Sequence, residues 1–276
     1  MFKDTRPLTE RIATFEESDP RWEVEISPQK IKELNQILAQ GFHFLGQGRQ
    51  CTTYESRDGS YVIKFLWQAP LGGGKHGYSQ FTDFSFLVDR FKNDQETYDR
   101  RKATLYSSFC VAYRYAPEQT GVQFMHLNST KDLFANTLVL DSREDPALIN
   151  SDSTQWVIQK RARLVKPVII ELMWKKKTRQ AKQRIDQLFA LLFECAKLGV
   201  IDGDSDLIFN DNIGFLENRA VYVDIGQLRR ATTPIDRELF KSDIARLDPL
   251  YEWLQKAYPE LAAYYKTRKT EVINSY

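Results

Sequence analysis

"LGVIDGDSDLIFNDNIGFLENRAVYVDIGQL", residues 198–228, decides how this chain folds. Its first half is rich in Asp and Asn, and its second half alternates apolar and polar residues around a turn near Asn218. The alternation predicts a β-hairpin whose second strand runs into Asp224. A carboxylate at that place can cap the end of the strand, or it can hold a metal ion against a phosphate. The residues upstream are needed to distinguish the two roles.

The composition is that of an ordinary globular protein. The chain has 276 residues, 42% of them hydrophobic and 28% charged, which suffices for one large domain or two smaller lobes. The formal charge of +2 is too small to predict a specific nucleic-acid partner. Cys51, Cys110 and Cys195 are widely separated, which favours a reducing compartment over a disulfide framework. No Cys/His spacing predicts a zinc site.

The chain carries no recognisable membrane or secretion signal. Its N-terminus lacks the apolar core of a signal peptide. The longest apolar stretches, "PVIIELMW" and "LFALLFECA", are far shorter than the ~20 residues of a membrane-spanning helix. We therefore expect a cytoplasmic protein. Secretion as a bacterial effector, through a signal that needs no apolar segment, stays open.

The first part of the chain predicts one short helix and a pair of strands. Residues before about Trp22 are polar and unpatterned, which predicts an N-terminal arm. "SPQKIKELNQILAQG" predicts a helix that starts at an N-cap, Ser27, and a first-turn proline and stops at Gly41. The strands "FHFLGQG" and "SYVIKFLW" follow. They are joined through "RQCTTYESRDG", whose Asp-Gly pair is a hairpin signal.

A long helix and further strands complete the first half. Residues 84–115 contain no Gly or Pro and predict the helix. "GVQFMHLN", "NTLVLDS" and "TQWVIQKRARL" have strand character, with a turn-rich loop, "REDPALINSDS", before the last of them. This order predicts an antiparallel sheet that carries one helix.

After Pro167 the pattern becomes helical. "KKKTRQAKQRIDQLFALLFECAKLG" places apolar residues on one stripe and ends at Gly199. The Asp/Asn-rich loop and the hairpin come next, and two helical patterns follow Pro234 and Pro259. We expect three parts: an arm and helix over 1–41, a sheet-rich lobe over 42–165 and a helix-rich lobe over 166–276.

A Gly-x-Gly loop precedes a lysine in the middle of a strand. In "LGQGRQC", Gly46 and Gly48 let the backbone approach a ligand and offer N–H groups to phosphate oxygens, although such a pair is more often a plain turn. In "SYVIKF", Lys64 is either an exposed face residue or a buried phosphate ligand. Such a lysine needs a carboxylate, and Glu96 is the only glutamate of the long helix. Its alternatives are Asp89, Asp94 and Asp99, and a solvated helix face is the simpler interpretation.

At this point the sequence resembles the protein-kinase-like superfamily. "GVIDGD" is similar to the kinase catalytic loop, with Asp202 in place of the histidine and Gly203 in place of the arginine. "DNIGF" resembles the asparagine that precedes the next strand, and "VYVDIG" resembles the strand that enters Asp-Phe-Gly, with Ile225 in place of the phenylalanine. The resemblance implies an α+β, bilobal fold. It comprises an antiparallel-sheet N-lobe with one long helix and a reduced, mainly helical C-lobe.

The resemblance also implies ATP and Mg²⁺. Asn212 and Asp224 would offer oxygen ligands to the metal, and Asp204 would act on the acceptor hydroxyl as the base. The kinase base and asparagine are five residues apart, whereas Asp204 and Asn212 are eight apart. Asp206 is therefore a rival base and Asn210 a rival metal ligand. An Asp/Asn-rich loop that is only a solvated turn is the simpler alternative.

Two further segments have predicted roles. The strand "WVIQKRARLV" would lead into the kinase hinge, where the main chain of Gln159, Lys160 and Arg161 binds adenine between Val62 and Ile158. An ordinary central strand explains the same residues. "WKKKTRQAKQR" predicts a solvated basic helix face or a surface, Lys175 to Arg184, that contacts an anionic partner.

Only about fifty residues follow "DIG", and the peptide-docking segment of an ordinary protein kinase is missing. This ending is similar to that of lipopolysaccharide-core kinases, aminoglycoside-type phosphotransferases and minimal effector kinases. Asp243 would then lie near the catalytic loop. The chain is expected to be a phosphotransferase acting on a sugar, lipid or protein hydroxyl. The alternative is a catalytically inactive pseudokinase that binds a protein or an anionic partner.

Overall fold

The computed structural model describes residues 8–15, 18–48, 50–67, 84–141, 145–204, 207–208 and 211–276, and within 84–98 only the backbone. The chain divides into two compact units. Unit 1 comprises Met1–Ser107 and Gln123–Gln159, and unit 2 comprises Ser108–Val122 and Lys160–Tyr276. The α+β class is confirmed, because strands and helices both contribute to each unit.

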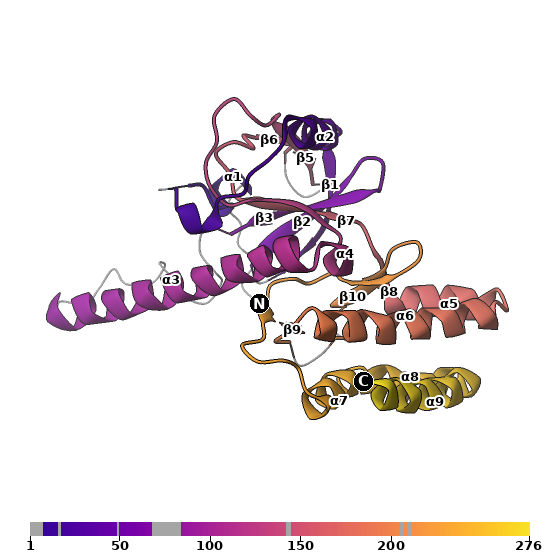
Figure 1. Ribbon diagram of the computed structural model, residues 1–276. Coiled ribbons are helices and arrows are strands. Elements are labelled where there is room, and N and C mark those ends of the chain that lie inside the picture. Colours follow the sequence, from indigo (N-terminus) through magenta and orange to yellow (C-terminus); the bar gives the residue numbers. More distant parts are fainter. Residues whose placement is uncertain are drawn as a thin grey trace. The chain divides into compact units, whose positions relative to one another are not determined.

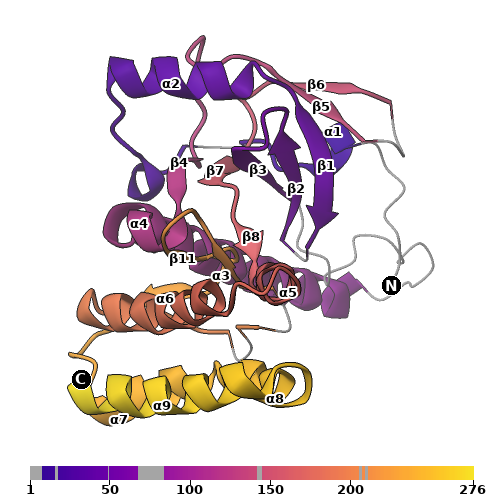
Figure 2. The same ribbon diagram turned by 90° about the vertical axis from the view of Figure 1, so that its right-hand side faces the viewer.

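Unit 1 is built on a seven-stranded sheet of order β4-β7-β3-β2-β1-β5-β6. Its strands are β1 (Phe42–Gln47), β2 (Cys51–Ser56), β3 (Tyr61–Leu66), β4 (Val122–His126), β5 (Thr137–Leu140), β6 (Ala147–Ile149) and β7 (Trp156–Lys160). The helices are α1 (Leu8–Arg11), η1 (Pro20–Trp22), α2 (Pro28–Leu38) and α3 (Phe84–Tyr115), whose last turns belong to unit 2. In both views α2 lies beside β5 and β6 (Figures 1 and 2).

The sheet is mixed, which corrects the expectation of a purely antiparallel sheet. β1 pairs with β2, β2 with β3 and β5 with β6 in antiparallel fashion, but β1 and β5 are parallel. β2 was expected to be a connection. It is a strand because it pairs with β1 on one side and β3 on the other, which leaves its residues alternately partly buried and buried. β6 lies within the stretch that was expected to be a loop, and it pairs Ile149 with Thr137.

Local signals explain the elements that the sequence predicts. Ser27 Oγ accepts a hydrogen bond from the Lys30 N–H at 3.2 Å, so α2 starts where expected. Gly59 has a φ of +69° in the β2–β3 turn, a conformation that glycine adopts without strain.

The expected arm before Trp22 does not hold for residues 8–15. Leu8, Ile12 and Ala13 are buried, and Ala13 N–H donates to Leu66 O at 2.7 Å. These residues therefore pack against the sheet and extend its backbone pairing, so they do not form a free arm.

Unit 2 is organised around the helix α6 (Thr178–Lys197), which lies between small strands and a layer of helices (Figures 1 and 2). The strands are β8 (Arg163–Leu164), β9 (Val200–Asp202), β10 (Ile213–Phe215), β11 (Ala220–Tyr222) and β12 (Leu228–Arg230). The other helices are α4 (Pro117–Thr120), α5 (Val165–Trp174), α7 (Arg237–Ala245), α8 (Asp248–Ala257) and α9 (Pro259–Ser275). β10 and β11 form the predicted hairpin.

Candidate functional site

The Asp-Gly-Asp stretch leaves β9 next to β12. Asp202 pairs in register with Leu228, and Gly203 N–H donates to Gln227 O at 3.0 Å. The Asp202 carboxylate is buried, with 5% of the residue exposed, and its Oδ1 accepts the Asp204 N–H at 3.1 Å. Asp202 thereby fixes the backbone at Asp204.

Arg246, at the end of α7, holds Asp202 in place. Its Nη2 donates to Asp202 Oδ2 at 3.1 Å and its Nη1 to Asp202 O at 3.0 Å. Nη1 also donates to Asp243 Oδ1 at 2.5 Å. Asp243 therefore reaches the loop through Arg246. Burial raises the pKa of Asp202 to about 6, and the hydrogen bond from Asp204 and the charge of Arg246 oppose that rise. Burial likewise raises the pKa of Asp243.

The structure brings Asp204, Asn212 and Asp224 together. Asn212 Nδ2 donates to Asp204 Oδ2 at 3.0 Å. The Asn212 carbonyl accepts from Val223 N–H at 2.7 Å and from Asp224 N–H at 3.3 Å, which joins the loop to the end of the hairpin. The rivals Asp206 and Asn210 lie outside the described residues.

Asp224 forms a turn and still offers an oxygen. Its Oδ1 accepts the Gly226 N–H at 2.9 Å, whereas its Oδ2 accepts no hydrogen bond from any residue that the structure describes. Ser108 Oγ donates to Ile225 O at 2.5 Å and so holds the same turn. The sequence does not point to Ser108 or Arg246, because both act over more than forty residues along the chain. No local spacing reveals such partners.

The donor chemistry fits Mg²⁺. Within the described ranges, no three His, Cys, Asp or Glu side chains gather as a metal site. The oxygen atoms that would hold the ion are those of the Asp224 carboxylate and of the Asn212 amide, whose Nδ2 donates to Asp204. Mg²⁺ commonly takes one or two protein carboxylates and completes its shell with water and substrate phosphates. Two protein oxygens are therefore an adequate set.

In unit 1, Lys64 lies in the middle of β3 opposite Thr53 of β2, and it is buried, with 8% of the residue exposed. Gly46 lies in β1 beside an irregularity of the β1–β2 pairing, and Gly48 N–H donates to Cys51 O at 2.9 Å. A Cβ at Gly46 would meet no described atom within 4 Å.

The structure describes the predicted hinge residues but not the side chain of the predicted lysine partner. Glu96 lies in α3, but its side chain is outside the described part of the chain. Ile158 is completely buried, Gln159 and Val62 are nearly so, and the division between the units falls between Gln159 and Lys160. Lys160 N–H donates to Gly121 O at 2.8 Å, so it is engaged within unit 2. Arg161 follows directly and is half-buried.

The basic segment from Lys175 to Arg184 contains both paired and unpaired side chains. Lys175 pairs with Glu171, and Lys182 pairs with Glu260. Arg184 donates to the carbonyls of Leu216 and Glu217 and lies over the Phe215 ring. Three exposed residues form no ion pair with any acidic side chain that the structure describes: Lys176, Lys177 and Arg179.

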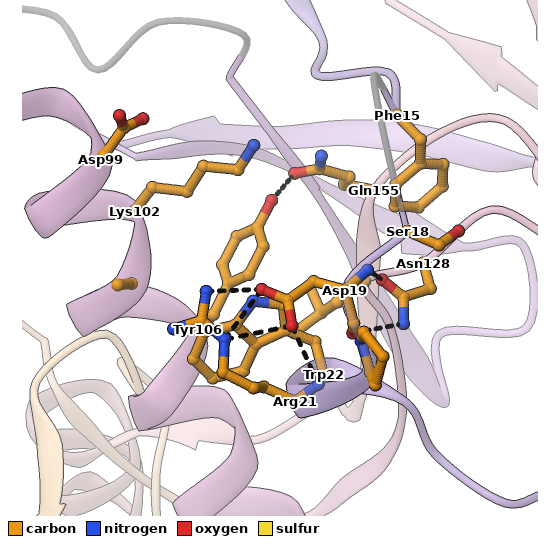
Figure 3. A pocket seen from close by; sticks show the side chains of 13 residues that line it. Phe15, Ser18, Asp19, Arg21, Trp22, Asp99, Lys102, Tyr106, Asn128 and Gln155 are labelled. Atoms are coloured by element: carbon orange, nitrogen blue, oxygen red, sulfur yellow. Dashed lines mark hydrogen bonds and ion pairs between the residues drawn. The ribbon is translucent and has the colours of Figure 1, made fainter. Parts of the chain in front are cut away.

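A pocket of about 770 Å³ opens in unit 1 (Figure 3). It lies between Phe15, residues 18–22, α3 and the ends of β4 and β7. Figure 3 shows Lys102 reaching over the Tyr106 ring, at 5.6 Å from its centroid. Tyr106 donates to Gln155, and Trp22 meets the edge of its ring. Of the candidate site residues whose side chains the structure describes, only Asp99 lines this pocket. The aromatic pair has no spacing signal because its members are far apart in the chain.

Comparison with known proteins finds similarity to solved structures. No protein-family model matches the chain, and no curated protein matches it. Among solved structures, a co-crystal structure of WbdD with the kinase inhibitor LY294002 shares 14% identity, with a TM-score of 0.38 over 83% of this chain. The bifunctional kinase-methyltransferase WbdD at medium resolution gives 14% and 0.38 over 80%. The chain spans 45% and 43% of the WbdD chains in those two structures. Scores this low support no conclusion about its chemistry.

Proposed function

We propose that this protein is an ATP- and Mg²⁺-dependent phosphotransferase that acts on a hydroxyl acceptor. The observation that carries the proposal is the joining of Asp204, Asn212 and Asp224 by hydrogen bonds between two separate loops. A solvated turn would not need a buried asparagine, yet Asn212 is buried and bonded on both its side chain and its carbonyl. The order of these residues is also that of the kinase-like superfamily.

Each of the three has a role that its contacts support. Asn212 and Asp224 would hold Mg²⁺, which supplies positive charge to neutralise the transferring phosphate. Asp204 would orient the acceptor hydroxyl and accept its proton, and the amide of Asn212 keeps the carboxylate in one orientation. Asp206 and Asn210 remain the rivals for these two roles.

Unit 1 would supply the nucleotide-binding residues. Gly46 and Gly48 have no positive φ, and no described neighbour excludes a Cβ at Gly46, so local folding does not demand glycine there. Glycine at these two positions would instead allow phosphate oxygens to approach the backbone closely. Lys64 would bind those oxygens, held by Glu96. Adenine would contact Val62, Ile158 and the main chain of residues 159–161.

The second candidate is a kinase-like binding module without catalysis. Two observations favour it: Lys160 N–H is already engaged, and Ile158 is fully covered. The proposal also includes three points about the surroundings of the protein. The acceptor is a sugar, lipid or protein hydroxyl, and the protein is cytoplasmic or secreted as an effector. The basic segment from Lys175 to Arg184 contacts an anionic surface.

Release of ADP from ATP tests the two candidates. The wild-type protein would be incubated with ATP, Mg²⁺ and panels of sugar, lipid and protein acceptors. We expect turnover that Lys64→Met lowers by at least about tenfold, because the phosphates lose a charge-assisted contact. Glu217→Gln, an exposed change in the β10–β11 turn, is the matched control. Two results together would support the binding module instead. No acceptor panel would give ADP release, and ATP would raise the melting temperature of the wild type but not of Lys64→Met.

A further inference from the structure

The outward side of α5 is an apolar stripe. Lys166 and Glu171 are the only charged residues of this helix, "VKPVIIELMW". Val165, Val168 and Ile169 are buried, whereas three apolar residues at helical spacing on another side are exposed: Pro167, Ile170 and Trp174. Ile170 is 47% exposed and Trp174 is 81% exposed.

Such a helix is expected to be covered. A helix with few charged residues and apolar side chains on more than one face normally packs in a core or contacts lipid. Single exposed apolar residues are common on proteins, but here they follow one another along one helix face up to its end. Trp174 is the largest of them and the most exposed. The stripe therefore favours an apolar partner outside unit 2.

Unpaired cations directly follow the stripe. The turn after Trp174 contains Lys176 and Lys177, and Arg179 lies in the first turn of α6. The one acidic residue of α5, Glu171, is negatively charged, since hydrogen bonds from Lys175 and Arg163 lower its pKa to about 2. Its ion pairs with these two cations offset that charge. The end of α5 thus presents an aromatic ring next to positive charge.

Lys176 occupies a backbone position that normally belongs to glycine. Its φ is +55°, its N–H donates to Met173 O at 3.0 Å, and the Lys177 N–H donates to Leu172 O at 2.8 Å. This is a Schellman ending of a helix. A lysine there carries a backbone cost of about 1 kcal/mol that glycine avoids. Replacement of Lys176 by glycine therefore removes charge without endangering the fold.

We propose that the α5 tip, defined as Pro167, Ile170, Trp174, Lys176, Lys177 and Arg179, docks on the surface of a lipid bilayer that contains anionic lipids. No helix in the described ranges is long and apolar enough to cross a membrane, so the contact would be superficial. This inference does not depend on the phosphotransferase activity.

The side-chain chemistry favours lipid over an acidic protein. A bilayer presents anionic headgroups and an apolar layer at adjacent depths, and Trp and Lys partition at that boundary. The neighbouring lysines would reach headgroup phosphates while Trp174 and Ile170 enter the interface. An acidic protein surface would match the charges but would leave the apolar stripe in water.

Vesicle co-sedimentation tests the proposal. The full chain would be mixed with phosphatidylcholine vesicles, alone or with about 30 mol% phosphatidylglycerol, at low salt. We expect binding to the anionic vesicles only. Trp174→Ser would weaken it by about fivefold or more, through loss of buried apolar area. The double change K176G/K177S would weaken it by about thirtyfold, since each lysine contributes about 1 kcal/mol near such a surface.

The controls change similar groups elsewhere. Leu148→Ser alters an apolar residue of unit 1 that is 63% exposed, and K256S/K266S removes two exposed lysines of α8 and α9. Both should bind like wild type. No binding to anionic vesicles would overturn the proposal. So would binding that the lysine changes abolish but Trp174→Ser leaves intact, because that result indicates an anionic partner without insertion.

Discussion

At the residue scale, Asp202 is buried beside Arg246. In the kinase-like proteins that the sequence resembles, histidine is expected at this position. A buried carboxylate costs free energy in its charged form, which is why its pKa rises to about 6 despite the arginine. Asp202 is therefore a structural acid whose hydrogen bond positions Asp204.

The raised pKa makes stability depend on pH. Between about pH 4 and pH 6 the folded protein holds a proton on Asp202 that the unfolded chain has lost. The contribution of this residue to the free energy of unfolding is thus full below about pH 4, and it is lost as the pH rises through about 6. Its size is at most about 3 kcal/mol for a shift of about two units. Asp202→Asn should remove it, as urea unfolding across this pH range would show. If the free energy of unfolding changed with pH in the same way in the wild type and in the variant, the raised pKa would not belong to Asp202.

At the element scale, one helix positions a loop that lies some forty residues earlier. Arg246 of the α7 end makes two hydrogen bonds to Asp202, and Asp202 in turn binds the backbone of Asp204. The link runs from helix to strand to loop. It gives α7 a direct influence on the orientation of the proposed base.

Arg246→Met should separate catalysis from nucleotide binding. The variant leaves Asp202 buried without its cation, so we expect a loss of about 3 kcal/mol of stability. In the folded protein, kcat should fall by about a hundredfold while KM for ATP changes little, because a small misplacement of the base affects mainly the reacting geometry. Arg246→Lys should recover part of kcat. Steady-state kinetics at a temperature where circular dichroism shows folded protein measures both.

Arg237→Met is the control for that experiment. Arg237 lies at the other end of α7 and donates to Asn274, away from the loop. An unchanged kcat in Arg246→Met, or an equal loss in Arg237→Met, would contradict the positioning role.

The elements also show what a sequence can predict. α2 and α6 carry caps or stripes that act within a few residues, and both form where expected. β2 and β6 were missed because their strand character depends on neighbouring strands; their own residues alternate weakly or number only three. The parallel pairing of β1 with β5 is likewise a property of the whole sheet. Long-range pairing leaves no local pattern.

At the scale of the whole molecule, the chain comprises two units that each have a sheet and helices of their own. The predicted site residues divide between them. Lys64 and the glycines lie in unit 1, and Asp204, Asn212 and Asp224 lie in unit 2. Motif order predicts both sets. The partners Ser108 and Arg246 came only from the structure, since their contacts span distant segments.

The central claim is that Asp224 is a metal ligand of a phosphotransferase as well as a turn former. Asp224→Asn keeps an oxygen that can accept the Gly226 N–H but removes the negative charge that Mg²⁺ requires. The decisive measurement is the rate of label transfer from γ-labelled ATP to an accepted substrate, with Mg²⁺ or with EDTA. We expect a rate that needs Mg²⁺ and falls by at least about a hundredfold in Asp224→Asn. Transfer that persists in EDTA, or that Asp224→Asn leaves at the wild-type rate, would contradict the account.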